Sequence, residues 1–147
     1  MDVRIKIKKL RDGAKIPLYA TPGSAAADLC YAGYGEIVLS PGETRLVPTG
    51  LAISMERDDV AAFIYARSGL ASKRGVAPAN CVGVIDSDYR GEIMVALRNH
   101  SAEPFTVCPG DRIAQMAIAP VYRARFEEAE TLDETERNDG GFGSTGI

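Results

Sequence analysis

The chain has few of the cysteines and histidines from which disulfide frameworks and zinc sites are built, and it has no long apolar run. Its cysteines, Cys30, Cys81 and Cys108, are odd in number and widely spaced, which predicts reduced thiols instead of disulfides or a CxxC metal pair. Reduced thiols fit a cytoplasmic protein, and the N-terminal MDVRIKIKKL does not resemble a signal peptide. No segment approaches membrane-spanning length, so no membrane partner is expected.

The chain also has a single histidine, His100, and no PCxxC sequence. A zinc-dependent base deaminase needs both kinds of ligand, so this class is poorly supported. A Ser-His-Asp hydrolase would need His100 as its base, but the surrounding RNHSAEP predicts a surface loop. The pattern GxxxxGK[ST] is missing as well, which excludes a Walker A nucleotide site.

The rest of the composition is that of one ordinary globular domain. The 147 residues include 46% hydrophobic and 25% charged residues, a balance typical of a single packed core. The net charge of −3 does not favour broad capture of nucleic acid, and no nucleic-acid partner is expected. A polyanionic ligand would have to be bound locally, by a few arginines and backbone amides.

Short apolar segments separated by glycine and proline predict an all-β fold. Val3, Ile5 and Ile7 alternate with basic residues, which is the pattern of a half-buried strand. Similar segments follow at 36–39, 51–55, 61–66, 92–99, 104–107 and 112–118. Many short strands with PG turns between them favour a sandwich, a jelly roll or a small barrel.

One short helix is predicted at 67–75, and its first residues form a candidate anion site. Ser68 is a suitable N-cap and Gly75 a suitable left-handed end. A helix N-terminus offers unpaired amides, Arg67 adds a bidentate cation, and Gly69 allows the backbone to approach an oxyanion closely. A plain capped helix explains the same residues.

A polar turn between the apolar segments 81–85 and 93–97 predicts a β-hairpin. If the hairpin folds near Ser87, Asn80 and Met94 lie roughly opposite each other at its base. An open hairpin of this kind could present backbone amide groups to a planar base, as an added strand does.

Two carboxylates, Asp86 and Asp88, lie in the turn of this hairpin. Because they are two residues apart, one side chain could face inward while the other meets solvent. A carboxylate beside a phosphate is repelled by it unless it has a task, such as holding a water for attack or contacting a metal. An ordinary Asp-rich turn explains these residues equally well.

The segment GDRIAQM, residues 110–116, predicts a strand. Strict alternation along it places Arg112, Ala114 and Met116 on one face and Gln115 on the opposite face. A lone glutamine in a strand is usually a surface or sheet-edge residue, so this segment is weak evidence of a site when taken alone.

The composition changes after Phe126. Residues 1–126 are predicted to form the β domain, whereas residues 127–147 are first acidic and then rich in glycine, which on composition alone favours a disordered tail. The glycines of RNDGGFGSTG permit a path close to a phosphate. Phe142 could stack on a base, and Arg137 could pair with a terminal phosphate.

Five segments, in their order and spacing, resemble the five motifs of the trimeric dUTP pyrophosphatase family. They are GSAAADL (23–29), RSGLASKRG (67–75), GVIDSDYRG (83–91), GDRIAQM (110–116) and RNDGGFGSTG (137–146). The third and fifth are highly specific, and the resemblance runs through nearly the whole chain. The chain departs from the family at Ala26 and Ala27, where Gly and a larger residue are usual, and at Ala66, where Pro is frequent.

The resemblance implies a fold, a reaction and an assembly. Family members are all-β, β-clip proteins, jelly-roll-like distorted barrels with one short helix, and they form homotrimers with three shared active sites. In this sequence Asp86 would activate the water that attacks the α-phosphorus of dUTP, which yields pyrophosphate and dUMP for thymidylate synthesis. A Mg²⁺ cofactor would be held mainly through substrate phosphates, with Asp28 supporting it through water.

The resemblance also implies which residues bind the substrate. They are Arg67, Ser68, Gly69, Asn80, Val84, Ile85, Tyr89, Met94, Gln115, Arg137, Phe142 and Gly143. Uracil would lie at the hairpin backbone near Asn80, and Tyr89 would pack against the deoxyribose and leave no room for a 2′-hydroxyl. The tail of one chain would close over the nucleotide of another, with Arg137 on the γ-phosphate and Phe142 over the base.

Two alternatives stay open on the sequence. A dCTP deaminase has a related fold and no zinc signature, so the missing CxxC does not exclude it, although the complete GVIDSDYRG favours hydrolysis. A nucleotide-binding regulatory module would need no chemistry, but the intact Asp86, Tyr89 and tail argue against a catalytically dead protein.

Overall fold

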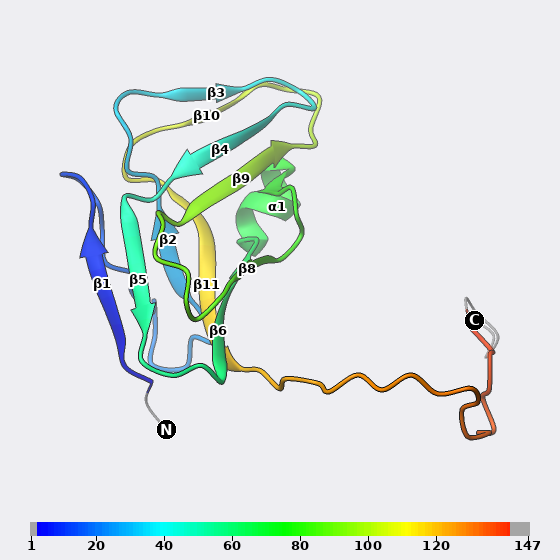
Figure 1. Ribbon diagram of the computed structural model, residues 1–147. Coiled ribbons are helices and arrows are strands. Elements are labelled where there is room, and N and C mark those ends of the chain that lie inside the picture. Colours follow the sequence, from blue (N-terminus) through cyan, green and yellow to red (C-terminus); the bar gives the residue numbers. More distant parts are fainter. Residues whose placement is uncertain (1–2, 142–147) are drawn as a thin grey trace.

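The computed structural model describes residues 3–141 and shows a body of short strands with one helix (Figure 1). The strands are β1 (Ile5–Lys9), β2 (Ala27–Cys30), β3 (Ile37–Leu39), β4 (Thr44–Pro48), β5 (Leu51–Met55), β6 (Val60–Tyr65), β7 (Val76–Pro78), β8 (Gly83–Ile85), β9 (Met94–Asn99), β10 (Phe105–Val107) and β11 (Arg112–Pro120). The helix α1 (Ser68–Arg74) follows β6 in the chain. The predicted all-β class with one short helix is confirmed.

The strands form small antiparallel sheets, and within residues 3–141 none of these sheets closes into a barrel. The largest has the order β2-β11-β6-β8, and a second has the order β4-β9-β7. Two further pairs, β1 with β5 and β3 with β10, complete the body. Because β11 lies between β2 and β6, it brings the chain segments before β2 and after β6 to one place (Figure 1).

Strand β9 illustrates how alternation builds the core. Val95 and Leu97 are buried in the interior, and the residues between and before them are more exposed. Burying one such side chain stabilises the fold by roughly 1.5–3 kcal/mol. Asn99 continues the inward face and is fully buried, but its amide is satisfied, since Nδ2 donates to the carbonyls of Leu39 (2.9 Å) and Glu103 (2.7 Å).

The helix begins at Ser68, the residue that was predicted to be its N-cap. Arg67, not Ser68, occupies the N-cap position, with an extended backbone (φ −84°, ψ 125°) and no side-chain cap hydrogen bond. The carbonyl of Arg67 already accepts from the amides of Leu70 and Ala71, which places Ser68 inside the first turn. The end at Gly75 is confirmed, because this glycine has the left-handed conformation (φ 66°) and donates to the carbonyl of Ala71.

The predicted hairpin around Asp86 is wrong as a paired ladder. Strand β8 pairs with β6, whereas β9 pairs with β4 and β7, so the two arms belong to different sheets. Each arm has antiparallel partners elsewhere, and a cavity lies between the two arms. The prediction that Asn80 and Met94 come together is nevertheless confirmed, because both line one cavity between the arms.

Strict alternation along β11 is also wrong at its start. A register shift between Arg112 and Ala114 inserts one extra residue, so that Arg112 pairs with Cys30 and Gln115 pairs with Asp28. This bulge buries both Ile113 and Ala114. Arg112 therefore lies on the same face as Gln115, not on the opposite face as alternation predicts.

Beyond Pro120 the described chain leaves the body as an extended arm without strand pairing (Figure 1). Tyr122 and Phe126 on this arm are 100% and 94% exposed. The predicted division of the chain at residue 126 stays a prediction. Among the described residues, no helix is long and apolar enough to cross a membrane.

Candidate functional site

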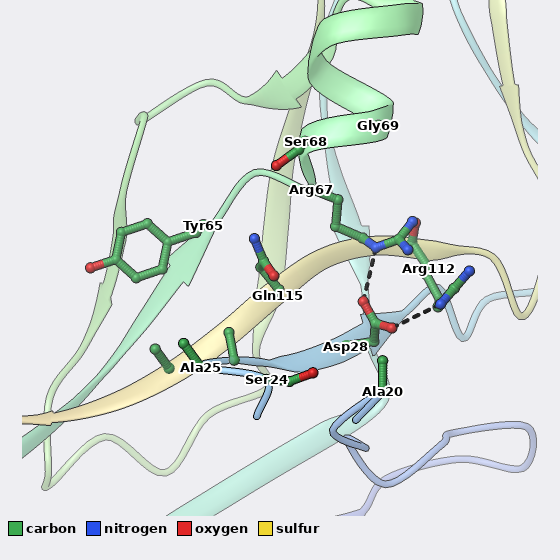
Figure 2. Close-up of a pocket in the computed structure, with 12 residues that line it drawn as sticks. Ala20, Ser24, Ala25, Asp28, Tyr65, Arg67, Ser68, Gly69, Arg112 and Gln115 are labelled. Atoms are coloured by element: carbon green, nitrogen blue, oxygen red, sulfur yellow. Dashed lines mark hydrogen bonds and ion pairs between the residues drawn. The ribbon is translucent and has the colours of Figure 1, made fainter. Parts of the chain in front are cut away.

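A cavity of about 670 Å³ lies at the start of α1 (Figure 2). Its lining comes from the loop before β2, from β2, from the β6–α1 junction and from β11: Ala20, Ser24, Ala25, Ala26, Asp28, Tyr65, Arg67, Ser68, Gly69, Arg112, Gln115 and Ala117. We refer to it as the Arg67 cavity. It brings together the residues predicted to hold phosphates, 67–69 and Gln115, and it includes the predicted metal-supporting residue Asp28.

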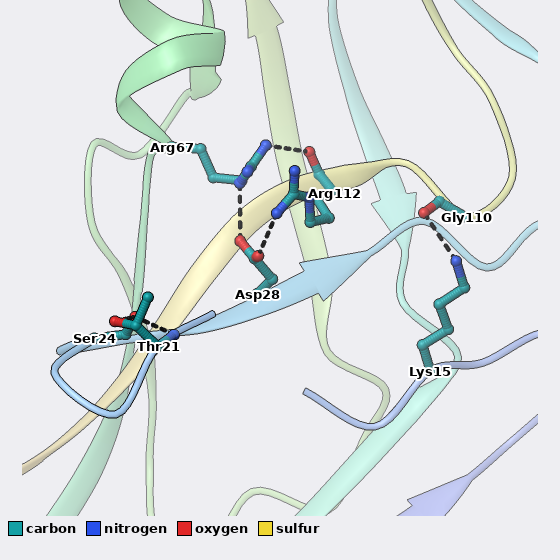
Figure 3. A network of polar contacts seen from close by, with 7 residues as sticks. All are labelled: Lys15, Thr21, Ser24, Asp28, Arg67, Gly110 and Arg112. Atoms are coloured by element: carbon teal, nitrogen blue, oxygen red, sulfur yellow. Dashed lines mark hydrogen bonds and ion pairs between the residues drawn. The ribbon is translucent and has the colours of Figure 1, made fainter. Parts of the chain in front are cut away.

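Two arginines share the carboxylate of Asp28 in this cavity (Figure 3). Arg67 Nε donates to Oδ1 at 2.8 Å, and Arg112 Nη1 donates to Oδ2 at 3.1 Å. Arg67 Nη1 also donates to the backbone carbonyl of Arg112 at 3.4 Å. Two guanidinium groups against one carboxylate leave the cluster with a net positive charge, which suits a polyanionic ligand in a chain that is acidic overall.

The residues next to Arg67 leave room for a ligand. Ser68 and Gly69 are exposed, and a Cβ on Gly69 would meet nothing within 4 Å. Gln115 lies on a central strand, not at a sheet edge, and its Nε2 donates to the carbonyl of Ala66 at 2.8 Å. This hydrogen bond anchors the chain immediately before Arg67, so Gln115 helps to fix the wall of the cavity.

A second, smaller cavity of about 130 Å³ lies between the splayed arms β8 and β9. It is lined by Leu46, Ile64, Asn80, Gly83, Val84, Ile85, Met94, Val95 and Ala96, and we refer to it as the Asn80 cavity. Strand β8 is the last strand of its sheet and pairs only with β6 among the described strands. Its outer backbone groups are therefore placed to hydrogen-bond a flat polar ligand.

The turn between the arms carries Asp86 and Tyr89. Asp86 and Asp88 are both exposed, which departs from the expectation that one could face inward. Within residues 3–141, no side-chain hydrogen bond or ion pair engages the Asp86 carboxylate, in contrast to that of Asp28. Tyr89 is 44% exposed, and its hydroxyl donates to the carbonyl of Glu92 at 3.1 Å. A Cβ on Gly91 would collide with the Tyr89 phenol, so a glycine at this position lets the ring take its place.

The two cavities have no lining residue in common, and neither Asp86 nor Tyr89 lines the Arg67 cavity. Asn80, Val84, Ile85 and Met94 come together as predicted, and so do the residues at 67–69 with Gln115. One chain therefore presents the predicted site as two halves, with the predicted catalytic Asp86 outside the cationic half.

The tail residues of the predicted site are only partly described. Arg137 is exposed, and its Nε donates to the carbonyl of Gly140 at 2.8 Å. Phe142 and Gly143 lie outside the described residues. Their roles stay predictions.

Arg112 is the residue of this site that the sequence reasoning missed. It stands three positions before Gln115, and strict alternation places it on the other face, so only knowledge of the bulge would have identified it. A basic residue at the start of a largely apolar strand was the available signal.

The thiols take no visible part in chemistry. Cys30, Cys81 and Cys108 are free, in agreement with the predicted reduced state. Cys30 neighbours the Asp28 cluster, but burial, opposed in part by Lys15, raises the pKa of its thiol and makes it a poor nucleophile. Among the described residues, no group of three or more His, Cys, Asp or Glu side chains forms a metal site.

Comparison with known families and proteins gives one consistent result. The family model described as dUTPase matches residues 12–146. The deoxyuridine 5'-triphosphate nucleotidohydrolase of Desulfitobacterium hafniense (strain DSM 10664 / DCB-2) is 54% identical, over 99% of this chain and 97% of that protein. The protein of the same name from Neisseria meningitidis serogroup A is 50% identical, over 100% of this chain and 98% of that protein.

Solved structures agree on the fold. A mutant dUTPase of Staphylococcus bacteriophage 80alpha, solved with dUpNHpp, superposes with a TM-score of 0.89 at 22% identity and covers 98% of this chain and 99% of its own. A mutant dUTPase from phage phi11 of S. aureus, described with a structural Mg(II) ion, has a TM-score of 0.80 at 19% identity, over 89% of this chain and 99% of its own. At these identities the likeness shows the all-β fold.

Proposed function

The chain belongs to the dUTPase family, and on this premise we propose which part of the substrate each of its two cavities binds. The reaction is hydrolysis of dUTP to dUMP and pyrophosphate, so the chain is a dUTP diphosphatase. The observation that carries the proposal is the Asp28 carboxylate shared by Arg67 and Arg112 in a cavity otherwise open to a ligand.

We assign the triphosphate to the Arg67 cavity. Arg67 offers further N–H groups beyond the one that Asp28 accepts, and a guanidinium binds phosphate oxygens in pairs. Ser68 and Gly69 add an exposed hydroxyl and an unobstructed backbone, and Gln115 completes the wall. These groups bind and orient the phosphates and lower the local negative charge that a water must approach.

We assign the uracil and the sugar to the Asn80 cavity and its rim. The outer edge of β8 offers backbone donors and acceptors to the base, Asn80 adds an amide, and Val84, Ile85 and Met94 supply apolar contacts. Tyr89, on the turn between the arms, packs against the deoxyribose. Its ring occupies the space that a 2′-hydroxyl would need, because a well-packed apolar wall rejects an added hydroxyl by collision.

We propose that Asp86 is the general base. Its carboxylate is exposed and has no partner within residues 3–141, so it can accept a proton from a water that attacks the α-phosphorus. The new P–O bond forms as the bond from this phosphorus to the bridging oxygen breaks, which releases pyrophosphate and leaves dUMP. Asp28 is unsuited to this role, because both of its carboxylate oxygens already accept hydrogen bonds from arginines.

The donor set suits a magnesium ion that arrives with the triphosphate. The described residues provide no protein cage, and both oxygens of Asp28 already accept hydrogen bonds from arginines. Mg²⁺ keeps much of its water shell and is commonly held by substrate phosphates, so Asp28 would contact it only through water. When bound, the ion would neutralise phosphate charge. The protein residues named above would bind the substrate and activate the water.

We further propose that the site is completed in a homotrimer. Asp86 and Tyr89 do not line the Arg67 cavity of their own chain, so the base would serve the cationic cavity of a neighbouring copy. The exposed aromatic residues Tyr122 and Phe126 on the extended arm support contacts with another chain. A cytoplasmic location belongs to the same proposal and is supported by the free thiols.

The experiment that tests the function is pyrophosphate release with dUTP, UTP, dTTP and dCTP, each with and without Mg²⁺. We expect hydrolysis of dUTP far above that of the other three, and a large loss of rate when EDTA removes the ion. Deamination of dCTP, with no pyrophosphate released from dUTP, would contradict the proposal and favour the deaminase alternative.

Tyr89→Ala tests the proposed sugar gate. Removing the ring opens the space for a 2′-hydroxyl, so the ratio of kcat/KM for UTP to that for dUTP is expected to rise by roughly tenfold or more. The matched control is Tyr65→Ala, which removes a tyrosine from the Arg67 cavity instead and should leave this ratio unchanged. If the ratio stays at the wild-type value in Tyr89→Ala, Tyr89 is not the gate.

A further inference from the structure

We infer that Arg112 is a positioning residue that keeps the guanidinium of Arg67 available to the triphosphate, by occupying the second oxygen of the Asp28 carboxylate. The inference rests on the proposed phosphate-binding function of the Arg67 cavity. It concerns a residue whose side chain acts through Asp28 and Arg67 and does not itself hold the substrate.

The geometry of the Asp28 carboxylate carries the inference (Figure 3). Its two oxygens are used separately, because Oδ1 accepts from Arg67 Nε at 2.8 Å and Oδ2 accepts from Arg112 Nη1 at 3.1 Å. Figure 3 shows each arginine joined to a different oxygen of Asp28. The Asp28 and Arg67 side chains are only 19% and 27% exposed, so this contact is partly shielded from water.

If Arg112 did not contact Asp28, the Asp28 carboxylate would bind Arg67 in a different way. Arginine and carboxylate groups prefer a bidentate pair, in which two parallel N–H groups meet the two oxygens. With Oδ2 filled by Arg112, Arg67 gives Asp28 only its Nε–H, and its terminal N–H groups stay outside the ion pair. Without Arg112, Asp28 would take a second N–H from Arg67 and so withdraw donors from an incoming phosphate.

The bulge in β11 makes this arrangement possible. The extra residue between Arg112 and Ala114 turns Arg112 to the face on which Gln115 stands opposite Asp28. The backbone carbonyl of Arg112 also accepts from Arg67 Nη1 at 3.4 Å, so the strand and the side chain at this position both fix the guanidinium. A regular strand would direct the Arg112 side chain away from Asp28.

The test uses Arg112→Gln, with Arg74→Gln as a matched control. Arg74 lines a neighbouring cavity together with Arg67 and Arg112, so its variant removes an equal charge nearby without a contact to Asp28. We expect Arg112→Gln to weaken binding of the imido analogue dUpNHpp and to raise the KM for dUTP by about tenfold, with a smaller change in kcat. Arg74→Gln should change both by less than about threefold. Arg112→Lys, which keeps a cation for Oδ2, should recover most of the affinity.

A double-mutant cycle separates positioning from direct binding. An amide at position 28 has a single acceptor oxygen and cannot form the bidentate pair in which two parallel N–H groups of Arg67 meet two oxygens. In the Asp28→Asn background, Arg112→Gln should therefore cost no more affinity than Arg74→Gln does. An equal loss of affinity with and without the Asp28 carboxylate would overturn the inference and make Arg112 a direct phosphate ligand.

The wild-type protein distinguishes failure of this inference from failure of the proposed function. If wild type neither hydrolyses dUTP nor binds dUpNHpp, the proposed function fails. If wild type does both, and the effects of Asp28→Asn and Arg112→Gln on affinity are additive, only the role of Arg112 fails. Equal melting temperatures of the variants show that the changes are local, and Arg112→Lys supplies the comparison if Arg112→Gln does not fold.

Discussion

Replacing Asp86 by asparagine is expected to lower kcat for dUTP by roughly 10²–10⁴-fold, because an amide keeps the shape of the side chain but cannot accept the proton of the attacking water. Binding of dUpNHpp should be largely kept, since no substrate contact is assigned to this carboxylate. The contacts of the two candidate carboxylates, Asp28 and Asp86, support this choice of base. Asp28 is held by two arginines, whereas Asp86 has no side-chain partner within residues 3–141.

The control for this prediction is Asp88→Asn. Asp88 stands two residues along the same turn and is also exposed, so its variant removes the same charge from the same segment. Its kcat should stay within about threefold of the wild-type value, as for a surface charge. A wild-type rate in Asp86→Asn, measured by pyrophosphate release, would refute the assignment, and a large loss in Asp88→Asn would transfer the role to that residue.

Deleting residues 137–147 is expected to lower kcat/KM for dUTP by roughly 10²-fold or more. The deletion removes the contact proposed between Arg137 and the γ-phosphate and the proposed stacking of Phe142 on the base, and each such interaction contributes on the order of 1–3 kcal/mol. The melting temperature should hardly change, because Arg137 is exposed and its described hydrogen bond stays within the tail.

Two point variants test the contribution of Phe142 separately from that of the rest of the tail. Phe142→Ala should reproduce part of the loss, and Phe142→Tyr, which keeps an aromatic ring, should retain most of the activity. Steady-state kinetics with dUTP measure all three proteins. An unchanged kcat/KM in the truncated protein would mean that the tail is the inert appendage that its glycine-rich composition suggests.

The sequence predicted the elements of the fold well where local chemistry determines them. Alternation and short apolar segments identified most of the strands, although β2, β4 and β7 were not predicted. Gly75 marked the end of the helix because a left-handed residue there favours glycine. Ser68 was misplaced by one position, since the extended backbone of Arg67 supplies the N-cap without a side-chain hydrogen bond. Whether a residue caps a helix depends on its backbone dihedral angles, and the residue type only biases these angles.

Pairing partners and local register could not be predicted in the same way. The arms on either side of Asp86 have the pattern of a hairpin, yet β8 pairs with β6 and β9 with β4 and β7, because sheet partners are chosen by the whole chain. The bulge after Arg112 leaves no mark in the alternation of residue types. For this reason the motifs could predict which residues bind the phosphates and the base, whereas the contact between Arg112 and Asp28 required the structure.

The division of the predicted site between two cavities leads to the central claim, that each working site is assembled from different chains. Asp86→Asn trimers and trimers truncated before Arg137 should each be nearly inactive. Unfolding, mixing and refolding them in equal amounts produces hybrid trimers, whose composition native mass spectrometry can confirm.

The decisive measurement is the dUTP hydrolysis of these hybrids. If Asp86 and the closing tail come from different chains, about a quarter of the sites combine an intact base with an intact tail, since random mixing meets each requirement half of the time. We therefore expect about a quarter of the wild-type activity to return. Activity that stays at the background of the two parent proteins, in confirmed hybrids, would show that base and tail belong to one chain and would contradict the shared site.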